Sequence, residues 1–212
     1  MRFRPSKRRH RSRSRPTVFA CGFGTACSRG RRGYHRGMND SVTPSDTPPI
    51  AIVGNVRIVD FQPRWRGDFA RLNIEWLERW FVVEPIDREV LNDPETHLLA
   101  GGGRVLFAVD DADRALGTVA LLRYDDGLVE LTKMAVEPGL RGGGIGRKLM
   151  AGAIAAFQDM GGRELFLESS HRLGPALKLY ESVGFRHHPA PRPGSHYQRA
   201  DVYMIWEAPA AG

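Results

Sequence analysis

The sequence predicts an α/β fold, with one domain over residues 56–207 in which helices flank a mixed sheet. Two observations support this prediction. Stretches rich in β-branched and alternating apolar residues, typical of strands, are interleaved with stretches whose apolar residues recur every three or four positions, as on one face of a helix. Their order is strand, two helices, three strands, helix, strand, helix and two strands, which is typical of a single mixed α/β sheet.

The first half of the domain holds five of these elements. Phe69, Leu72 and Trp76 mark one face of an amphipathic helix, and Asp68 is its expected cap. The next helix is short and ends before Pro94, because the residue before a proline disfavours helical backbone. The five elements are a strand at 56–60, helices at 67–80 and 87–92, and strands at 105–109 and 117–123.

The second half holds six elements. An Asp-Gly pair in the segment 124–127 predicts a hairpin turn between the third and fourth strands. A Pro-rich loop at 189–193 separates the last two strands. The six elements are a strand at 128–136, a helix at 144–159, a strand at 164–169, a helix at 175–183, and strands at 185–188 and 200–206.

The composition excludes several classes of protein. With 42% hydrophobic residues in a chain of 212, there is enough apolar material for a core, so disorder of the whole chain is excluded. No run approaches the roughly 18 consecutive apolar residues of a membrane-spanning helix. The two cysteines, Cys21 and Cys27, precede the domain and cannot form a disulfide scaffold.

The net charge of +7 comes from the amino-terminal segment. Residues 1–37 hold 12 of the 31 Lys and Arg and no Asp or Glu, so residues 38–212 hold 19 basic and 24 acidic residues, a net charge of −5. The overall charge therefore gives no reason to expect a specific nucleic-acid partner for the domain.

Four interpretations of residues 1–37 are open. A secretory signal is disfavoured because the segment has no long apolar stretch, whereas Arg and Ser without acids fit an organellar transit peptide. A dense Arg arm also binds nucleic acid without sequence preference. We favour the fourth interpretation, in which Met38 is the native start. Residues 38–55 are then a Pro-rich leader and residues 208–212 a tail, and we expect a cytoplasmic protein.

The most informative stretch is LTKMAVEPGLRGGGIGRKLM, at residues 131–150. A strand ends at Val136, and a glycine-rich turn then opens a helix. The free N–H groups and positive dipole end of a helix favour an anion, and glycines let a phosphate approach the backbone. The stretch therefore predicts a pyrophosphate site, although its spacing differs from the P-loop and dinucleotide motifs. The residues expected in this site are Arg141, Gly142, Gly143, Gly144, Ile145, Gly146 and Arg147.

Three motifs occur in a fixed order along the domain. Arg-x-x-Gly-x-Gly at 141–146 follows the Met-Ala-Val end of a strand, Glu168 lies in the next strand, and Leu-Tyr-Glu-Ser-Val-Gly-Phe occupies 179–185. In this order and spacing, the motifs resemble the GNAT superfamily of acyl-CoA-dependent N-acyltransferases. The resemblance extends over about residues 56–207. It implies a mostly antiparallel sheet with a splayed fourth strand, and acetyl-CoA as co-substrate.

The resemblance also implies which residues hold acetyl-CoA. The pantetheine arm would pair with the backbone of Met134, Ala135 and Val136 like an added strand. The diphosphate would lie on the glycine-rich turn. Ser170 stands where family members often have an Asn that touches the arm, so its contact would have a shorter reach.

Two residues are implied as catalytic. Tyr180 would protonate the departing thiolate, although it also shares an apolar face with Leu177 and Val183, which suits a core tyrosine. Glu130 would deprotonate the amine. The alternative for Glu130 is an exposed strand residue paired with a basic side chain across the sheet.

The acceptor is expected between the first helices and the last two strands. Trp76 is interpreted as a core residue, and Arg199 and Asp201 either hold a charged acceptor or pair with each other. His187, His188 and His196 do not predict a metal site, because no patterned carboxylate or cysteine accompanies them. The candidate acceptor residues are Asn73, Glu75, Trp76, Arg199, Asp201 and Tyr203.

The sequence thus predicts an N-acetyltransferase that moves an acetyl group from acetyl-CoA to a primary amine by direct attack. A small-molecule or amino-acid acceptor is favoured, with no membrane partner, and the protein is expected to be a monomer or homodimer. The alternatives are an acyl-CoA-sensing module with a nucleic-acid-binding arm and a protein N-acetyltransferase.

Overall fold

The computed structural model describes residues 55–190, 192 and 199–208. The interpretations of residues 1–37 and of the Pro-rich leader up to residue 54 concern positions outside this part of the chain. The same holds for His196 and for residues 209–212 of the expected tail. Among the described residues, no helix is long and apolar enough to cross a membrane.

A seven-stranded sheet forms the centre of the fold. The strands lie in the order β1-β2-β3-β4-β5-β7-β6, and every neighbouring pair is antiparallel except β4 and β5. The predicted mixed and mostly antiparallel sheet is therefore confirmed. The strands are β1 (Arg57–Asp60), β2 (Arg104–Val109), β3 (Ala115–Arg123), β4 (Leu128–Val136), β5 (Glu164–Ser169), β6 (Phe185–His187) and β7 (Val202–Trp206).

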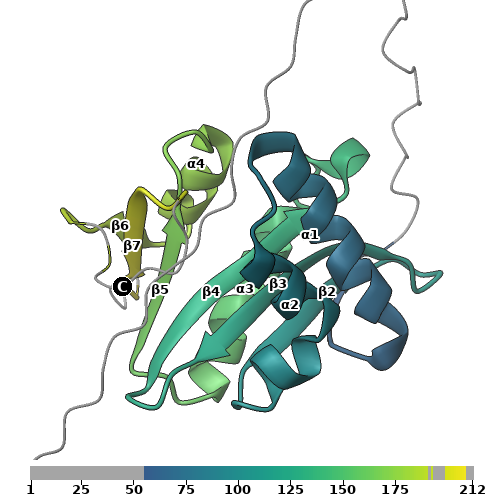
Figure 1. The fold of residues 1–212 in the computed structure, drawn as a ribbon, viewed down its shortest axis with the longest axis horizontal. Helices are drawn as coiled ribbons and strands as arrows, with labels where there is room; N and C mark the ends of the chain where they lie inside the picture. Colours follow the sequence, from purple (N-terminus) through teal and green to yellow (C-terminus); the bar gives the residue numbers. More distant parts are fainter. Residues whose placement is uncertain (1–54, 191, 193–198, 209–212) are drawn as a thin grey trace, which may run out of the picture. The chain divides into compact units, whose positions relative to one another are not determined.

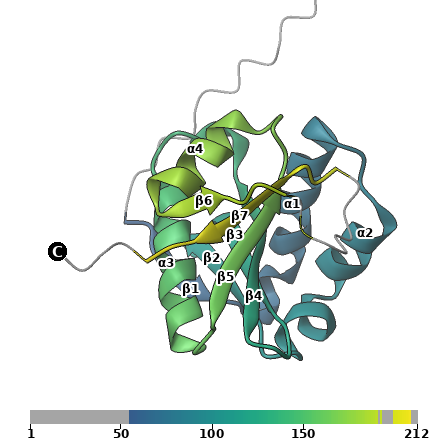
Figure 2. The same ribbon diagram turned by 90° about the vertical axis from the view of Figure 1, so that its left-hand side faces the viewer.

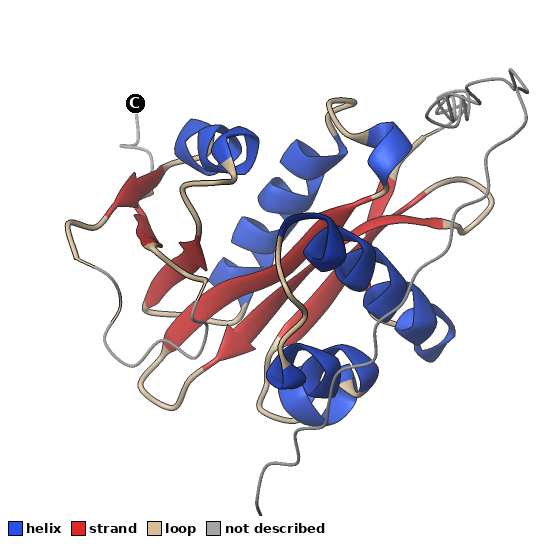
Figure 3. Ribbon diagram, turned by 45° about the horizontal axis from the view of Figure 1, so that its top comes forward, coloured by secondary structure: helices blue, strands red, loops and turns tan. Residues whose placement is uncertain are grey.

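Helices cover both faces of this sheet (Figures 1 and 2). One face carries α1 (Arg66–Trp80) and α2 (Pro85–Asn92), and the other carries α3 (Ile145–Asp159) and α4 (Gly174–Ser182). Side chains alternate along each strand, so β2 sends Leu106 to the core under α3 and Phe107 to the core under α1. Figure 3 shows the strands as one layer between the two sets of helices.

Strands β4 and β5 part soon after they meet. They pair only where Leu128–Glu130 faces Glu164–Phe166, and β5 then continues beside β7. Figure 1 shows β5 diverging from β4 toward α4. This separation is the splayed fourth strand that the sequence predicts, and it leaves one edge of β4 from Leu131 onward without a strand partner among the described residues.

A β-bulge interrupts β4 a few residues after its pairing with β5 ends. Thr118 faces Ala135 and Ala120 faces Thr132, so Lys133 and Met134 together oppose one residue of β3. Lys133 has a φ of 50°, which is unusual for a residue with a Cβ. The bulge was not predicted, because no Gly or Asn marks it in the sequence.

Several element boundaries differ from the predictions. Helix α1 begins at Arg66, so the predicted cap is wrong: Asp68 lies inside the first turn and pairs with Arg71 at 3.0 Å. Helix α2 begins at Pro85 rather than residue 87, because Glu84 and Asp87 form a capping box and proline suits the first helical position. A short π-helix at Glu95–Leu99 was missed, and β7 begins at Val202 rather than residue 200.

Gly103 lies close to the backbone of Leu98 and Leu121, and a substitution at Gly103 tests this close packing. A Cβ at Gly103 would lie against the carbonyl oxygens of Leu121 and Leu98, the latter at 2.6 Å. Since backbone must move to make room, we expect Gly103→Ala to destabilise the domain by about 1–3 kcal/mol in denaturant unfolding. Gly67→Ala is the control, because its Cβ meets nothing within 4 Å and alanine favours the helix by up to ~1 kcal/mol. Equal stability of the two variants would contradict this packing.

Candidate active site

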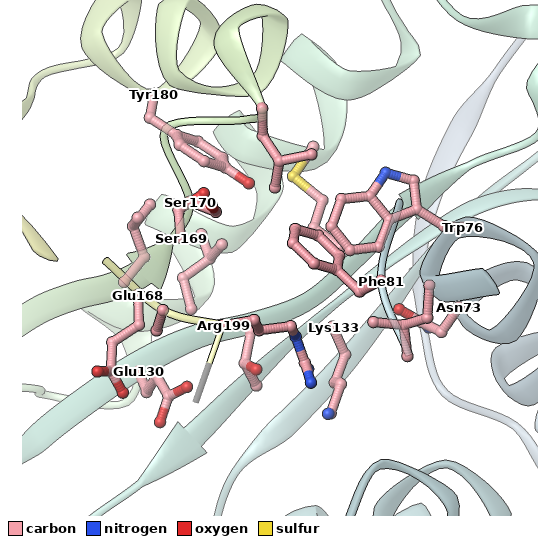
Figure 4. Close-up of a pocket in the computed structure, with 17 residues that line it drawn as sticks. Asn73, Trp76, Phe81, Glu130, Lys133, Glu168, Ser169, Ser170, Tyr180 and Arg199 are labelled. Carbon is pink, nitrogen blue, oxygen red and sulfur yellow. The ribbon is translucent and has the colours of Figure 1, made fainter. Parts of the chain in front are cut away.

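The opening between β4 and β5 leads into an inner cavity of about 90 Å³ (Figure 4). Helix α1, strands β4 and β5, helix α4 and the segment before β7 all contribute side chains to it. The polar residues that line it include Glu130, Lys133, Glu168, Ser170, Tyr180 and Arg199. The sequence predicted four of these six as site residues, from positions spread over 70 residues of the chain.

An outer cavity of about 470 Å³ lies between the end of β4, the start of α3 and helix α4. Met134, Ala135 and Val136 line one side of it, and Arg141, Gly142 and Gly146 line its end. The two cavities share Trp76, Met134, Leu173 and Tyr180, so they meet at these four side chains. The glycine-rich turn lines the outer cavity and Glu130 lines the inner one.

The glycine-rich turn has the backbone of an anion site. Gly142 and Gly144 have φ values of 85° and 82°, and a Cβ at either position would meet nothing within 4 Å, so the backbone conformation, not crowding, requires glycine. Gly144 is the residue that caps α3. No side chain caps the first turn of α3, so its N–H groups and the positive end of the helix dipole are available to an anion at this turn.

Two arginines flank this turn. Arg141 donates from Nε to the carbonyl oxygen of Val136 at 2.9 Å and pairs with Glu75 at 2.7 Å. Arg147 donates to the hydroxyl of Ser182 at 3.1 Å. Glu75 was a candidate for acceptor binding, but the structure places it beside Arg141 at the glycine-rich end and not in the inner cavity.

Glu130 lies at the last residue of β4 that pairs with β5, and only 5% of it is exposed. The hydroxyl of Tyr124 donates a hydrogen bond to its Oε2 at 2.7 Å. Burial raises the pKa of Glu130 and the nearby charge of Glu168 adds to this, while the Tyr124 hydrogen bond only partly offsets the rise. The alternative of an exposed Glu130 paired with a base across the sheet is therefore wrong.

Tyr180 projects from α4 to the junction of the two cavities, and its hydroxyl points into the inner one (Figure 4). Its ring packs against Phe185 with centroids 6.1 Å apart. Burial raises the pKa of Tyr180 to about 12, so the hydroxyl keeps its proton at neutral pH and is available as a donor. The ring thus packs on the core, as the apolar face of α4 predicted, while its polar end enters the cavity.

A buried ion cluster lies beside the inner cavity, where Lys133 and Arg199 line it. Asp87 on α2 is 0% exposed and accepts hydrogen bonds from Lys133 at 2.7 Å and from two nitrogens of Arg199 at 2.9 Å. Arg199 also pairs with Glu84 at 2.7 Å. Burial opposes the charge of Asp87, but the Arg199 and Lys133 hydrogen bonds outweigh it and hold the pKa of Asp87 below its usual range.

The remaining acceptor candidates fall into two groups. Asn73 and Trp76 line the inner cavity; Asn73 also donates to the carbonyl oxygen of Phe69 at 2.9 Å, and Trp76 packs at the edge of the core. Asp201 is exposed, and its Oδ1 accepts a hydrogen bond from the backbone N–H of His171 at 2.8 Å. It therefore does not pair with Arg199, and it does not line the inner cavity. Tyr203 packs edge-to-face against Phe166, and it does not line the inner cavity.

Sequence reasoning missed Tyr124, Glu84, Asp87 and Lys133 as site residues. Tyr124 was assigned only to a hairpin turn, and Lys133 only to the predicted strand at 128–136. The signal for Asp87 was its position three residues after Glu84 and two after Pro85, the pattern of a capping box. Among the described residues, no three His, Cys, Asp or Glu side chains are grouped to hold a metal.

Comparison with known proteins places these features in a family. Residues 101–187 match the family model described as the acetyltransferase (GNAT) domain. Over 139 residues, the chain is 30% identical to an uncharacterized N-acetyltransferase of Schizosaccharomyces pombe, and the match covers 61% of this chain and 85% of that protein. The chain belongs to the GNAT family of N-acetyltransferases. The predicted family and enzyme class are confirmed.

Other relatives of this GNAT protein match over shorter stretches or by fold alone. Mycothiol acetyltransferase of Actinosynnema mirum is 34% identical over 80 residues, which are 38% of this chain but only 27% of that protein. A GNAT acetyltransferase of Staphylococcus aureus shares the fold with a TM-score of 0.65 at 20% identity, covering 72% and 98% of the two chains. A phosphinothricin acetyltransferase of Sinorhizobium meliloti, solved with acetyl-CoA, shares the fold with a TM-score of 0.57 at 17% identity. The match covers 71% of this chain and 86% of that chain.

The Tyr124–Glu130 hydrogen bond predicts how this GNAT protein responds to pH. Tyr124→Phe removes a donor to the carboxylate, so we expect the pKa of Glu130 to rise by at least about one unit, since a hydrogen bond to a charged group contributes ~1.5–3 kcal/mol. NMR titration of carboxyl-labelled Glu measures this directly. Tyr203→Phe is the control, since its ring packs on the same Phe166 at 5.8 Å. An unmoved Glu130 titration in Tyr124→Phe would contradict the hydrogen bond.

Proposed function

We propose that this GNAT protein transfers the acetyl group of acetyl-CoA to the primary amine of a small molecule. The observation that carries the proposal is that the outer cavity, at the glycine-rich turn, adjoins the inner cavity, with Tyr180 lining both and Glu130 lining the inner one. This arrangement suits an extended thioester whose diphosphate lies at the turn and whose acetyl group reaches Tyr180.

In this proposal, acetyl-CoA uses backbone groups more than side chains. The edge of β4 at Met134, Ala135 and Val136 lines the outer cavity, and the amide groups of the pantetheine arm would pair with it as an added strand. The first-turn N–H groups of α3 would hold the diphosphate. Ser170, which is buried and borders the inner cavity, would contact the arm near its sulfur end.

The proposed reaction is a direct attack without a covalent enzyme intermediate. The lone pair of the neutral amine attacks the thioester carbon, and a backbone N–H on the free edge of β4 would stabilise the oxyanion. The C–S bond then breaks. Glu130 takes the proton that the amine loses, and Tyr180 donates to the departing sulfur. The raised pKa of Glu130 suits a base that works near neutral pH.

One observation favours catalysis over an acyl-CoA-sensing role, and a second concerns the size of the acceptor. A sensing module needs only the outer cavity, whereas here two proton-transfer groups converge on the inner one. The inner cavity, at about 90 Å³, admits only a few heavy atoms at the reacting end of an acceptor. An open-ended screen of amines that follows the release of free CoA tests the activity itself.

The position of the diphosphate can be tested at Gly144. Gly144→Asp puts a negative charge into the turn, so we expect calorimetry to show acetyl-CoA binding weakened at least about tenfold, as one lost charged hydrogen bond contributes ~1.5–3 kcal/mol. Gly144→Asn is the matched control, because it adds the same bulk and backbone strain without the charge and should lose less. Unchanged affinity in a folded Gly144→Asp variant would rule out this placement.

The role of Tyr180 can be tested by removing its hydroxyl. Tyr180→Phe keeps the ring packed on Phe185, so we expect turnover to fall about 100-fold while the KM for acetyl-CoA changes little, because the loss is confined to the transition state. Rates are followed through free CoA with the best amine from the screen. A variant within twofold of the wild-type protein would mean that Tyr180 has only a packing role.

A further inference from the structure

The inner cavity carries opposite charges at its two sides. Glu130 and Glu168 come from the neighbouring strands β4 and β5, just where these strands part, and Lys133 and Arg199 lie on the other side (Figure 4). The carboxylates suit an amine. Lys133 and Arg199 are paired with Asp87 and Glu84, but of these four side chains only the two cations line the cavity.

The backbone of β4 is distorted in a way that places one of these cations. With regular alternation Lys133 would point into the apolar core under α3, because Leu131 does. The bulge, with a φ of 50° at Lys133, turns its side chain instead to the α2 side of the sheet, where it meets Asp87. Strained backbone of this kind is concentrated at functional sites, where bulges re-aim side chains.

The ion cluster presents its positive members to the cavity. Lys133 and Arg199 line the inner cavity, whereas Asp87 and Glu84, their partners, are not in its described lining. The side chains of Lys133 and Arg199 are only 5% and 18% exposed, so water screens their charge weakly. Asp87 and Glu84 hold both cations in place, which removes the entropy cost of ordering them when an anion binds.

From this geometry we infer that Lys133 and Arg199 form a subsite for a carboxylate, and that the acceptor is an α-amino acid whose amine lies at Glu130. The inference rests on the proposed function and names its substrate class. A cavity of about 90 Å³ with carboxylates on one side and cations on the other requires an amine and a carboxylate only a few bonds apart. Arginine, with its planar fork of donors, is well suited to a carboxylate.

The test compares acceptors that differ only in the carboxylate. The sets are phenylalanine, phenylalaninamide and phenethylamine, and leucine, leucinamide and isoamylamine, each assayed by free CoA release with the full-length protein. The amines of the amides are less basic than those of the acids, so a larger fraction of them is neutral and able to attack. Without a carboxylate subsite, the amides would therefore react faster than the acids. We expect the amino acid to exceed its amide and its amine at least tenfold in kcat/KM in one set or both.

A variant links this preference to the subsite. Arg199→Lys keeps a positive charge against Asp87 but loses the planar fork, so we expect the acid-to-amide ratio to fall several-fold while the Kd for acetyl-CoA is unchanged. Arg186→Lys is the control. Arg186 lies on β6, outside the cavity, and its Nε is 3.8 Å from Oε2 of Glu207. The comparison of acceptors on the wild-type protein needs no variant to fold.

The outcomes separate this inference from the proposed function. Transfer to the amides or amines with no preference for the acids, or no transfer to any member of either set, overturns the carboxylate subsite. An unchanged acid-to-amide ratio in Arg199→Lys overturns it as well. The proposed function fails on a different result, namely that acetyl-CoA does not bind in calorimetry.

Discussion

Strands β4 and β5 are hydrogen-bonded to each other over only three residue pairs, and the site depends on where this pairing stops. A parallel pair that continued would bring the strands within about 4.8 Å and leave no room between them. Because β5 turns to β7, the edge of β4 is free, the start of α3 is exposed at one end of the opening, and Glu130 lies at the other.

The bulge at Lys133 divides β4 into two parts that line different cavities. On one side of the bulge, Glu130 faces the inner cavity, and on the other, Met134 to Val136 line the outer one. The bulge itself brings Lys133 to Asp87, which also caps α2 and binds Arg199 before β7. One buried carboxylate therefore joins α2, β4 and the segment before β7, which are far apart in the sequence and lie beside the inner cavity.

Much of the fold followed from local pattern. Every predicted strand and helix is present, because apolar periodicity reports which face of an element is buried, whatever the partner is. The ends were less predictable: α1 and α2 begin earlier than expected, and the start of α2 is set by Pro85 and by the capping box of Glu84 and Asp87. The π-helix and the bulge have no sequence signature, as both arise from the fit between neighbouring segments.

The sequence by itself determined the fold class, the family, the glycine-rich turn, and the positions of Glu130 and Tyr180 on the strand and helix that face the opening. These features depend on the spacing of residues within single elements and motifs, which is the same whatever the tertiary structure. Only the tertiary structure decided that Glu75 and Asp201 bind Arg141 and His171, and that Lys133, Arg199 and Asp87 meet beside the inner cavity. Pairings between residues 30 to 112 positions apart depend on how the elements pack, and no local pattern encodes that.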